Sequence, residues 1–190
     1  MKIVDVITLQ SCGPYAGSAH WRRTRKQIHQ AVKRCEWPVG SGSFTIGELK
    51  RRGWVIEGKA KNALAQELGD FDAVLPGPEK PIVVEWETGN ISSSHRSMNK
   101  LTMLVSCGVI SAGILVVPSR KLYAYLTDRI GNVAYLTDRI GNVRELEPYF
   151  GLWKSVPCDS GVLELVVIEH DAESYDVPRI PKMTAGRAGG

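Results

Sequence analysis

The sequence contains few cysteines, and none of them are paired closely along the chain. The 190 residues include four, at Cys12, Cys35, Cys107 and Cys158, with no C-x-x-C spacing. Zinc fingers and knuckles draw their thiolate ligands from such close pairs, so this class of site is disfavoured. The chain also shows no signal-peptide pattern, and the expectation is a cytoplasmic protein with reduced thiols.

Long hydrophobic runs are also missing. The longest one, around residues 109–118, has about half of the ~20 residues that a membrane-spanning helix needs, and no association with a membrane is predicted. The composition, with 43% hydrophobic and 23% charged residues, is that of a folded protein. The length suits one domain over residues 1–190, in which about 171–190 form a loosely ordered tail.

Acidic residues are scarce in one part of the chain, although the net charge is only +4. Between residues 20 and 62 there are eleven lysines and arginines against three glutamates. Such a basic region suits the phosphates of a nucleic acid. It is equally compatible with the solvated face of a helix.

Carboxylates gather instead in residues 71–100. Residues 71–75 and 81–87 favour strands, because β-branched and aromatic side chains dominate them, and the residues between them favour a turn. Side chains alternate along a strand, so Glu85 and Glu87 share one face, about 7 Å apart. If the two strands pair as a hairpin, Asp72 converges on the same point.

Three carboxylates at one point suit a hard divalent cation, and Mg²⁺ is the expected one. Such an ion activates water and stabilises a phosphate under attack. The alternative interpretation is that Glu85 and Glu87 are only the solvated face of a half-buried sheet. The acidic residue on the preceding strand and the cations that follow favour a functional site.

Two groups of cations are candidates for contacts with DNA. A helix is predicted over about residues 93–107, with serines as N-caps and His95, Arg96 and Lys100 on its polar face. A helix N-terminus next to such side chains can bind a phosphate. Arg51 and Arg52, in a short helix over residues 48–52, are expected to contact the DNA backbone.

The rest of the chain predicts an α/β domain with a mixed central sheet and helices on both sides. Strands are expected at residues 1–9, 54–57, 109–118 and 161–169, and helices at 18–35 and 59–67, with 145–153 helical or irregular. A perfect ten-residue repeat, AYLTDRIGNV at 124–133 and again at 134–143, is too short for a repeat architecture and indicates a local duplication.

Asp72, the turn and Glu85-Trp86-Glu87 resemble the P-D…(D/E)-x-K nuclease core, in the variant that has glutamate in place of the final lysine. This variant occurs in the BamHI/BglII/BstYI group of type II restriction endonucleases. The similarity extends to the N-terminal strand MKIVDV and the tryptophan-containing helix after it, to LKRRGW at residues 49–54, and to the apolar strand at residues 112–118.

The resemblance implies a restriction-endonuclease-like fold and Mg²⁺-dependent cleavage of double-stranded DNA at a short palindrome, with GATC as the expected centre. Asp72 is preferred over Asp70 as a metal ligand, together with Glu85. Glu87 would orient the attacking water or act as the base, because the family's usual lysine is absent. A homodimer is implied, to which the helix after the active site contributes.

Two other interpretations remain open at this stage. One is a catalytically silent DNA-binding protein on the same fold, in which Glu85 and Glu87 are merely solvated. The other is a repair or mobile-element nuclease that uses the same core without tight sequence specificity.

Overall fold

The computed structural model describes residues 1–34, 47–59, 63–87, 91–123 and 143–172. Within them, six strands form one sheet in the order β1-β6-β5-β4-β3-β2. The strands are β1 (Lys2–Cys12), β2 (Val55–Gly58), β3 (Phe71–Leu75), β4 (Ile82–Trp86), β5 (Ala112–Pro118) and β6 (Gly161–Glu169). β4, β5 and β6 are parallel to one another, whereas β1, β3 and β2 pair antiparallel with their neighbours. The predicted mixed sheet is therefore confirmed.

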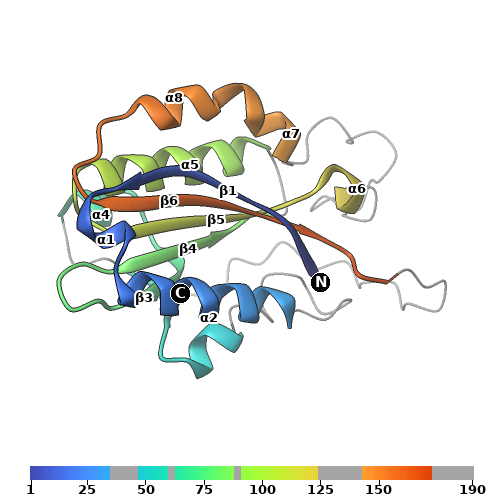
Figure 1. Ribbon diagram of the computed structural model, residues 1–190, viewed down its shortest axis with the longest axis horizontal. Coiled ribbons are helices and arrows are strands. Elements are labelled where there is room, and N and C mark those ends of the chain that lie inside the picture. Colours follow the sequence, from blue (N-terminus) through green and yellow to red (C-terminus); the bar gives the residue numbers. More distant parts are fainter. Residues whose placement is uncertain (35–46, 60–62, 88–90, 124–142, 173–190) are drawn as a thin grey trace.

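Helices cover both faces of this sheet, as predicted. Figure 1 shows α5 and α8 on one side of the sheet and α2 on the other. The helices are α1 (Gly13–Ala16), α2 (Ala19–Lys33), α4 (Ala63–Glu67), α5 (Ile91–Ser106), α6 (Arg120–Tyr123), α7 (Val143–Leu146) and α8 (Phe150–Ser155), with a 3-10 turn, η2 (Glu147–Tyr149), before α8. Residues 47–51 are also helical.

Each face of the sheet has its own hydrophobic core, and β4 supplies both. Ile82, Val84 and Trp86 pack in the core beneath α2, while Val83 packs in the core beneath α5. This alternation is what the strand periodicity predicts, and it directs Glu85 to the α5 face. All five residues of β4 are buried, so Glu85 is buried because it lies within an otherwise apolar strand.

The helix boundaries follow local capping where a cap is present. Ser18 caps α2, since its side chain accepts a hydrogen bond from the backbone N–H of Trp21 at 3.0 Å, as predicted. α5 begins at Ile91, about two residues earlier than the serines indicated. β5 begins at Ala112, three residues later than predicted, and the backbone N–H of Ser111 just before it donates to the carbonyl of Pro81.

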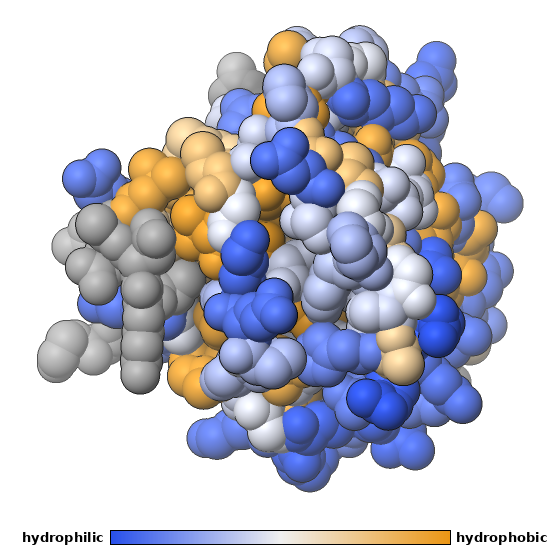
Figure 2. Space-filling view, turned by 60° about the vertical axis from the view of Figure 1, so that its left-hand side comes forward, coloured by the Kyte–Doolittle hydropathy of each residue, from blue (hydrophilic) through white to orange (hydrophobic). Residues whose placement is uncertain are grey.

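Several predictions lie outside the described residues. The repeat at 124–133 and 134–143 falls there except for Val143, as do the tail from residue 173 and Cys35. Cys12, Cys107 and Cys158 are free thiols. No helix in the described part of the chain is long and apolar enough to cross a membrane. Figure 2 shows a face dominated by hydrophilic residues, with apolar side chains in small groups.

A glycine on β5 sets the distance between α5 and the sheet. A Cβ atom added to Gly113 would lie 3.0 Å from the Cβ of Leu101 on α5, and that atom cannot move without the helix backbone. The close approach holds α5 over the sheet and thereby fixes where the polar side chains of the helix reach β4.

We expect Gly113→Ala to lower the free energy of unfolding by about 1–3 kcal/mol, the usual cost of overpacking a core. The matched control is Gly151→Ala on α8, where an added Cβ meets nothing within 4 Å. That change should leave stability unchanged or raise it by about 0.5–1 kcal/mol, because alanine favours a helix. Urea unfolding measures both, and equal effects at the two positions would contradict the close packing.

Candidate active site

The register between β3 and β4 places Asp72 opposite Glu85. Ala73 pairs with Val84 and Val74 with Val83, so the next pair outward along the strands is the acidic one. The backbone N–H of Trp86 donates to Oδ2 of Asp72 at 2.7 Å, and the backbone N–H of Asp72 donates to Oε2 of Glu85 at 3.3 Å. Each carboxylate is thus held by the backbone of the opposite strand.

Burial makes both of these carboxylates hard to ionise. Removal from water raises the pKa of Glu85 to about 7, and the nearby charge of Asp72 adds to this effect. The pKa of Asp72 is also raised, again because of burial, although the hydrogen bond from Trp86 and the charge of Lys100 oppose the shift. A buried and a half-buried acid side by side attract a positive charge.

Lys100 supplies one such charge from α5. Its Nζ lies 2.7 Å from Oε1 of Glu85, donates to the backbone carbonyl of Asp70 at 2.7 Å, and stands 3.9 Å above the ring of Phe71. The side chain is only 10% exposed. Lys100 was predicted as a DNA-contacting residue, and the structure places it inside the carboxylate cluster.

Glu87 follows β4 and also reaches toward α5. Its backbone N–H donates to the carbonyl of Val116, and its Oε1 accepts a hydrogen bond from Oγ of Ser97 at 2.8 Å. Glu85 and Glu87 therefore share the α5 face of the sheet, as the strand periodicity predicts. Ser97 was not singled out from the sequence, because a serine at this place on a helix carries no distinguishing pattern.

The three carboxylates do not close into one metal-binding group. Among the described residues, no three His, Cys, Asp or Glu side chains are arranged to hold a metal ion together. Asp72 and Glu85 form a pair, and Glu87 stands beside it. When Asp72 and Glu85 are both ionised, Lys100 neutralises only one of the two negative charges. Carboxylate oxygens with a remaining negative charge fit Mg²⁺, which keeps part of its hydration shell in such sites.

A further acid, which the sequence did not indicate as a site residue, lies in the same row across the strands. β2 pairs with β3 so that Ile56 faces Ala73 and Gly58 faces Phe71, which places Glu57 opposite Asp72. The charge of Glu57 helps to raise the pKa of Asp72. Its φ of 47° is the one positive value at a non-glycine position in the described residues, and it indicates local strain. Only the pairing register reveals this position.

The two remaining candidates on α5 lie apart from the carboxylates. The ring of His95 packs edge-on against Tyr149, with centroids 4.4 Å apart, and lies 5.8 Å from Trp153. This contact joins α5 to η2 and α8. Arg96 is exposed, and no ion pair holds it within the described residues.

Arg51 and Arg52 belong to a separate cluster around Glu48. Arg51 forms an ion pair with this carboxylate, Arg52 lies 3.8 Å from it, and Arg34 at the end of α2 lies 3.5 Å from it. One buried acid thus gathers three arginines, and a net positive charge remains. Arg52 also donates to the side chain of Gln30 at 3.2 Å.

The sequence is similar to that of known restriction enzymes over most of its length. The sequence model of the family described as "Restriction endonuclease BamHI" matches residues 1–135 and 133–187. The two segments meet at the ten-residue repeat, where an inserted copy would interrupt a continuous match. The type II restriction enzyme OkrAI of Oceanobacter kriegii is 38% identical over 179 residues, which is 85% of this chain and 87% of that protein.

Two further comparisons agree with this relationship. The type II restriction enzyme BamHI of Bacillus amyloliquefaciens is 43% identical over 109 residues, covering 56% of this chain and 43% of that enzyme. The crystal structure of restriction endonuclease BglII complexed with a DNA 16-mer superposes with a TM-score of 0.63, covering 92% of this chain and 81% of that chain. At 13% sequence identity this likeness shows the shared fold. The chain belongs to the BamHI family of type II restriction endonucleases.

Proposed function

We propose that this restriction endonuclease cleaves double-stranded DNA at a short palindrome centred on GATC, in a reaction that depends on Mg²⁺. The pairing of Asp72 with Glu85 at the end of a buried hairpin is the observation that carries the proposal. Removal from water has raised the pKa of both groups, and a structural role alone gives no reason to place a buried and a half-buried acid beside each other.

In this proposal, Asp72 and Glu85 hold the metal ion through their carboxylate oxygens. A bound Mg²⁺ supplies positive charge next to the phosphate and makes a neighbouring water easier to deprotonate. Glu87 accepts or orients the proton of the attacking water, and Ser97 holds its carboxylate by the hydrogen bond at 2.8 Å. Lys100 limits the repulsion between the acids through its contact of 2.7 Å with Glu85.

Contacts with DNA outside the cleavage centre are proposed for the remaining cations. Arg96, which is exposed on α5, is proposed to contact DNA outside the carboxylate cluster. The net positive cluster that includes Arg51 and Arg52 suits the phosphate backbone. His95 packs against aromatic rings on η2 and α8, so only the edge of its ring that faces away from them could contact DNA.

A homodimer is proposed because symmetric cutting of a palindrome calls for two active sites related by a two-fold axis. The surface beside α5 supports this arrangement. Tyr149 and Leu152, on η2 and α8, are 46% and 59% exposed, and apolar side chains of this size favour contact with another protein surface.

Cleavage of plasmid and phage DNA tests the proposed reaction. With Mg²⁺ we expect discrete fragments, whose ends map to one GATC-containing palindrome, and with EDTA we expect intact DNA. A smear of fragments with Mg²⁺ would indicate a non-specific nuclease instead of a site-specific enzyme. DNA binding without any cleavage would favour a silent member of the family, and discrete fragments in EDTA would exclude the metal requirement.

A further inference from the structure

One face of α2 carries positive charge that the cleavage centre does not use. The helix contains five lysines and arginines and no acidic residue in its 15 positions. Like charges three or four positions apart on a helix destabilise it by a few tenths of a kcal/mol per pair. An arrangement of this kind is favourable when an anion covers it.

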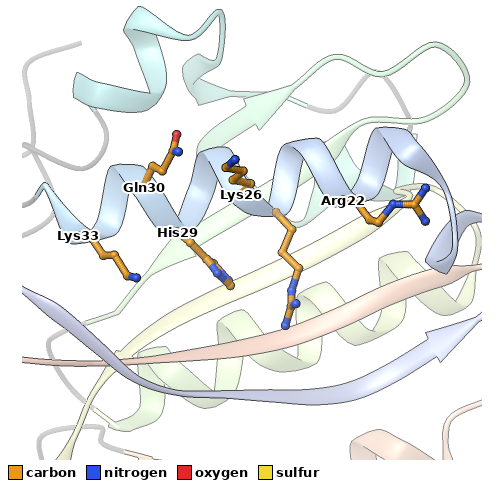
Figure 3. Close-up of a pocket in the computed structure, with 6 residues that line it drawn as sticks. Arg22, Lys26, His29, Gln30 and Lys33 are labelled. Carbon is orange, nitrogen blue, oxygen red and sulfur yellow. The ribbon is translucent and has the colours of Figure 1, made fainter.

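Six side chains on this face line a single cavity of about 410 Å³. They are Arg22, Arg25, Lys26, His29, Gln30 and Lys33. Their spacing of three and four residues forms one stripe, about 16 Å long from the first to the last at 1.5 Å per residue. Figure 3 shows Arg22 and Lys33 at its two ends and Lys26, His29 and Gln30 between them.

Only one of these cations is neutralised within the described residues. Nε of Arg25 lies 2.9 Å from Oε1 of Glu164 on β6, a carboxylate that is 4% exposed. Arg22 donates to the backbone carbonyl of Gly17, which leaves its charge uncompensated. Lys26 and Lys33 are exposed, and no carboxylate of the described chain lies within ion-pair distance of either.

A buried polar atom in the same stripe has no partner. Nε2 of His29 is buried, and it forms no hydrogen bond within the described residues. Burial and the neighbouring charges of Arg25 and Lys33 lower the pKa of His29 to about 4, so the ring is neutral at pH 7. The ring therefore adds no positive charge to the stripe, whose charge comes from its lysines and arginines.

We propose that the α2 stripe is a second DNA-binding surface, which holds the phosphate backbone of duplex DNA without reading its sequence. A stripe of about 16 Å is long enough to follow the backbone of one strand over more than one phosphate. α2 covers the face of the sheet opposite α5 (Figure 1), so the stripe is separate from the carboxylates that α5 contacts. The inference rests on DNA as the substrate, although it requires neither Mg²⁺ nor the GATC site.

The test is the salt dependence of binding to a duplex of about 40 base pairs that contains no GATC, measured by fluorescence anisotropy in EDTA. Each phosphate contact contributes about −0.9 to the slope of log affinity against log salt concentration. We expect the double variant Lys26→Gln/Lys33→Gln to reduce the magnitude of the slope by about 1.8 and to weaken binding at low salt by about tenfold or more.

The matched control removes two positive charges elsewhere, in Lys80→Gln/Lys154→Gln. Lys80 lies in the turn before β4 and Lys154 on α8, both away from α2. An unchanged slope in the α2 variant, or an equal change in the control, would overturn the proposal. Binding of inorganic phosphate by the wild type, with no effect of the α2 variant on duplex binding, would overturn it in favour of a small-anion site.

Cleavage separates this surface from the active site. A duplex of about 16 base pairs that carries the mapped site should be cut at the wild-type rate by the α2 variant, while the same site in plasmid DNA at limiting enzyme should be cut several-fold more slowly. Equal loss on both substrates would show that the stripe belongs to the cleavage complex. If the wild type cuts neither DNA, the proposed reaction fails, and the anisotropy result still decides the role of α2.

Discussion

Glu85→Gln should abolish DNA cleavage and leave the folded structure intact. Glutamine keeps the size of the side chain, and its one amide oxygen can still accept the hydrogen bond from Lys100, which lies 2.7 Å from Oε1 of Glu85. The longer hydrogen bond of 3.3 Å from the backbone N–H of Asp72 to Oε2 is lost, because an amide nitrogen takes the place of that oxygen. The substitution removes the negative charge that the proposed metal site requires. A metal ion contributes several kcal/mol to phosphate hydrolysis, so the cleavage rate should fall by about 10³-fold or more.

The stability of this variant distinguishes loss of chemistry from loss of folding. Because the pKa of Glu85 is raised to about 7, the folded protein retains a proton that the unfolded chain has already lost above its ordinary value of 4.5. Wild-type stability therefore falls as the pH rises from about 4.5 to about 7. Glutamine does not titrate, and its free energy of unfolding at pH 8 should exceed that of the wild type, by up to about 3 kcal/mol.

The measurements are plasmid cleavage with Mg²⁺, duplex binding in EDTA, and urea unfolding at two pH values. Glu79→Gln makes the same chemical change at an exposed position in the turn between β3 and β4, and it should retain full activity. Cleavage by Glu85→Gln within tenfold of the wild-type rate would contradict the assignment. A variant that is less stable than the wild type and no longer binds DNA would show that Glu85 is structural.

Local patterns were enough to find the central hairpin. Alternation in the residues of β4 placed Glu85 and Glu87 on one face and Val84 and Trp86 on the other, and the structure has the same arrangement. Ser18 could be identified as the N-cap of α2 because its capping bond spans only three residues. Such features depend on near neighbours in the chain.

Features that depend on distant pairing could not be found in this way. Glu57 faces Asp72 only because β2 joins the edge of the sheet in one particular register. Lys100 was placed on the polar face of its helix, but its position beside Glu85 depends on the close packing of Leu101 against Gly113. β1 and β6, the first and the last strand of the sheet along the sequence, pair with each other, and no periodicity in either strand indicates that partner.

The α2 stripe shows how a charge pattern gains meaning from the fold. The sequence showed a basic region, which suited a nucleic acid and a solvated helix face equally well. In the structure, the apolar residues Trp21, Ile28 and Val32 pack on the sheet. The cations consequently lie along the side of the helix next to this packed face, where Arg25 reaches Glu164 on β6 and the side chains of the stripe line one cavity.

The concentration of Mg²⁺ needed for half-maximal cleavage should rise about tenfold when the pH is lowered from about 8 to about 6. Protons and the metal ion compete for the carboxylate of Glu85. With a pKa of about 7, the ionised fraction of this group falls from about nine-tenths to about one-tenth over that range. A carboxylate with an ordinary pKa would stay ionised over this range, and the concentration of Mg²⁺ needed for half-maximal cleavage would then not change with pH.

Half-saturation is the informative quantity because the maximal rate also changes with pH when water is deprotonated in the reaction. Lys100→Met provides a sharper control. Lys100 lowers the pKa of both Glu85 and Asp72, so its removal should move the midpoint of the pH dependence upward. Above that midpoint the variant should need no more Mg²⁺ than the wild type, since the repulsion between lysine and metal ion is also gone. A midpoint that does not move in Lys100→Met would show that the titrating group lies elsewhere, and the proposed assignment of the metal to Asp72 and Glu85 would lose its electrostatic basis.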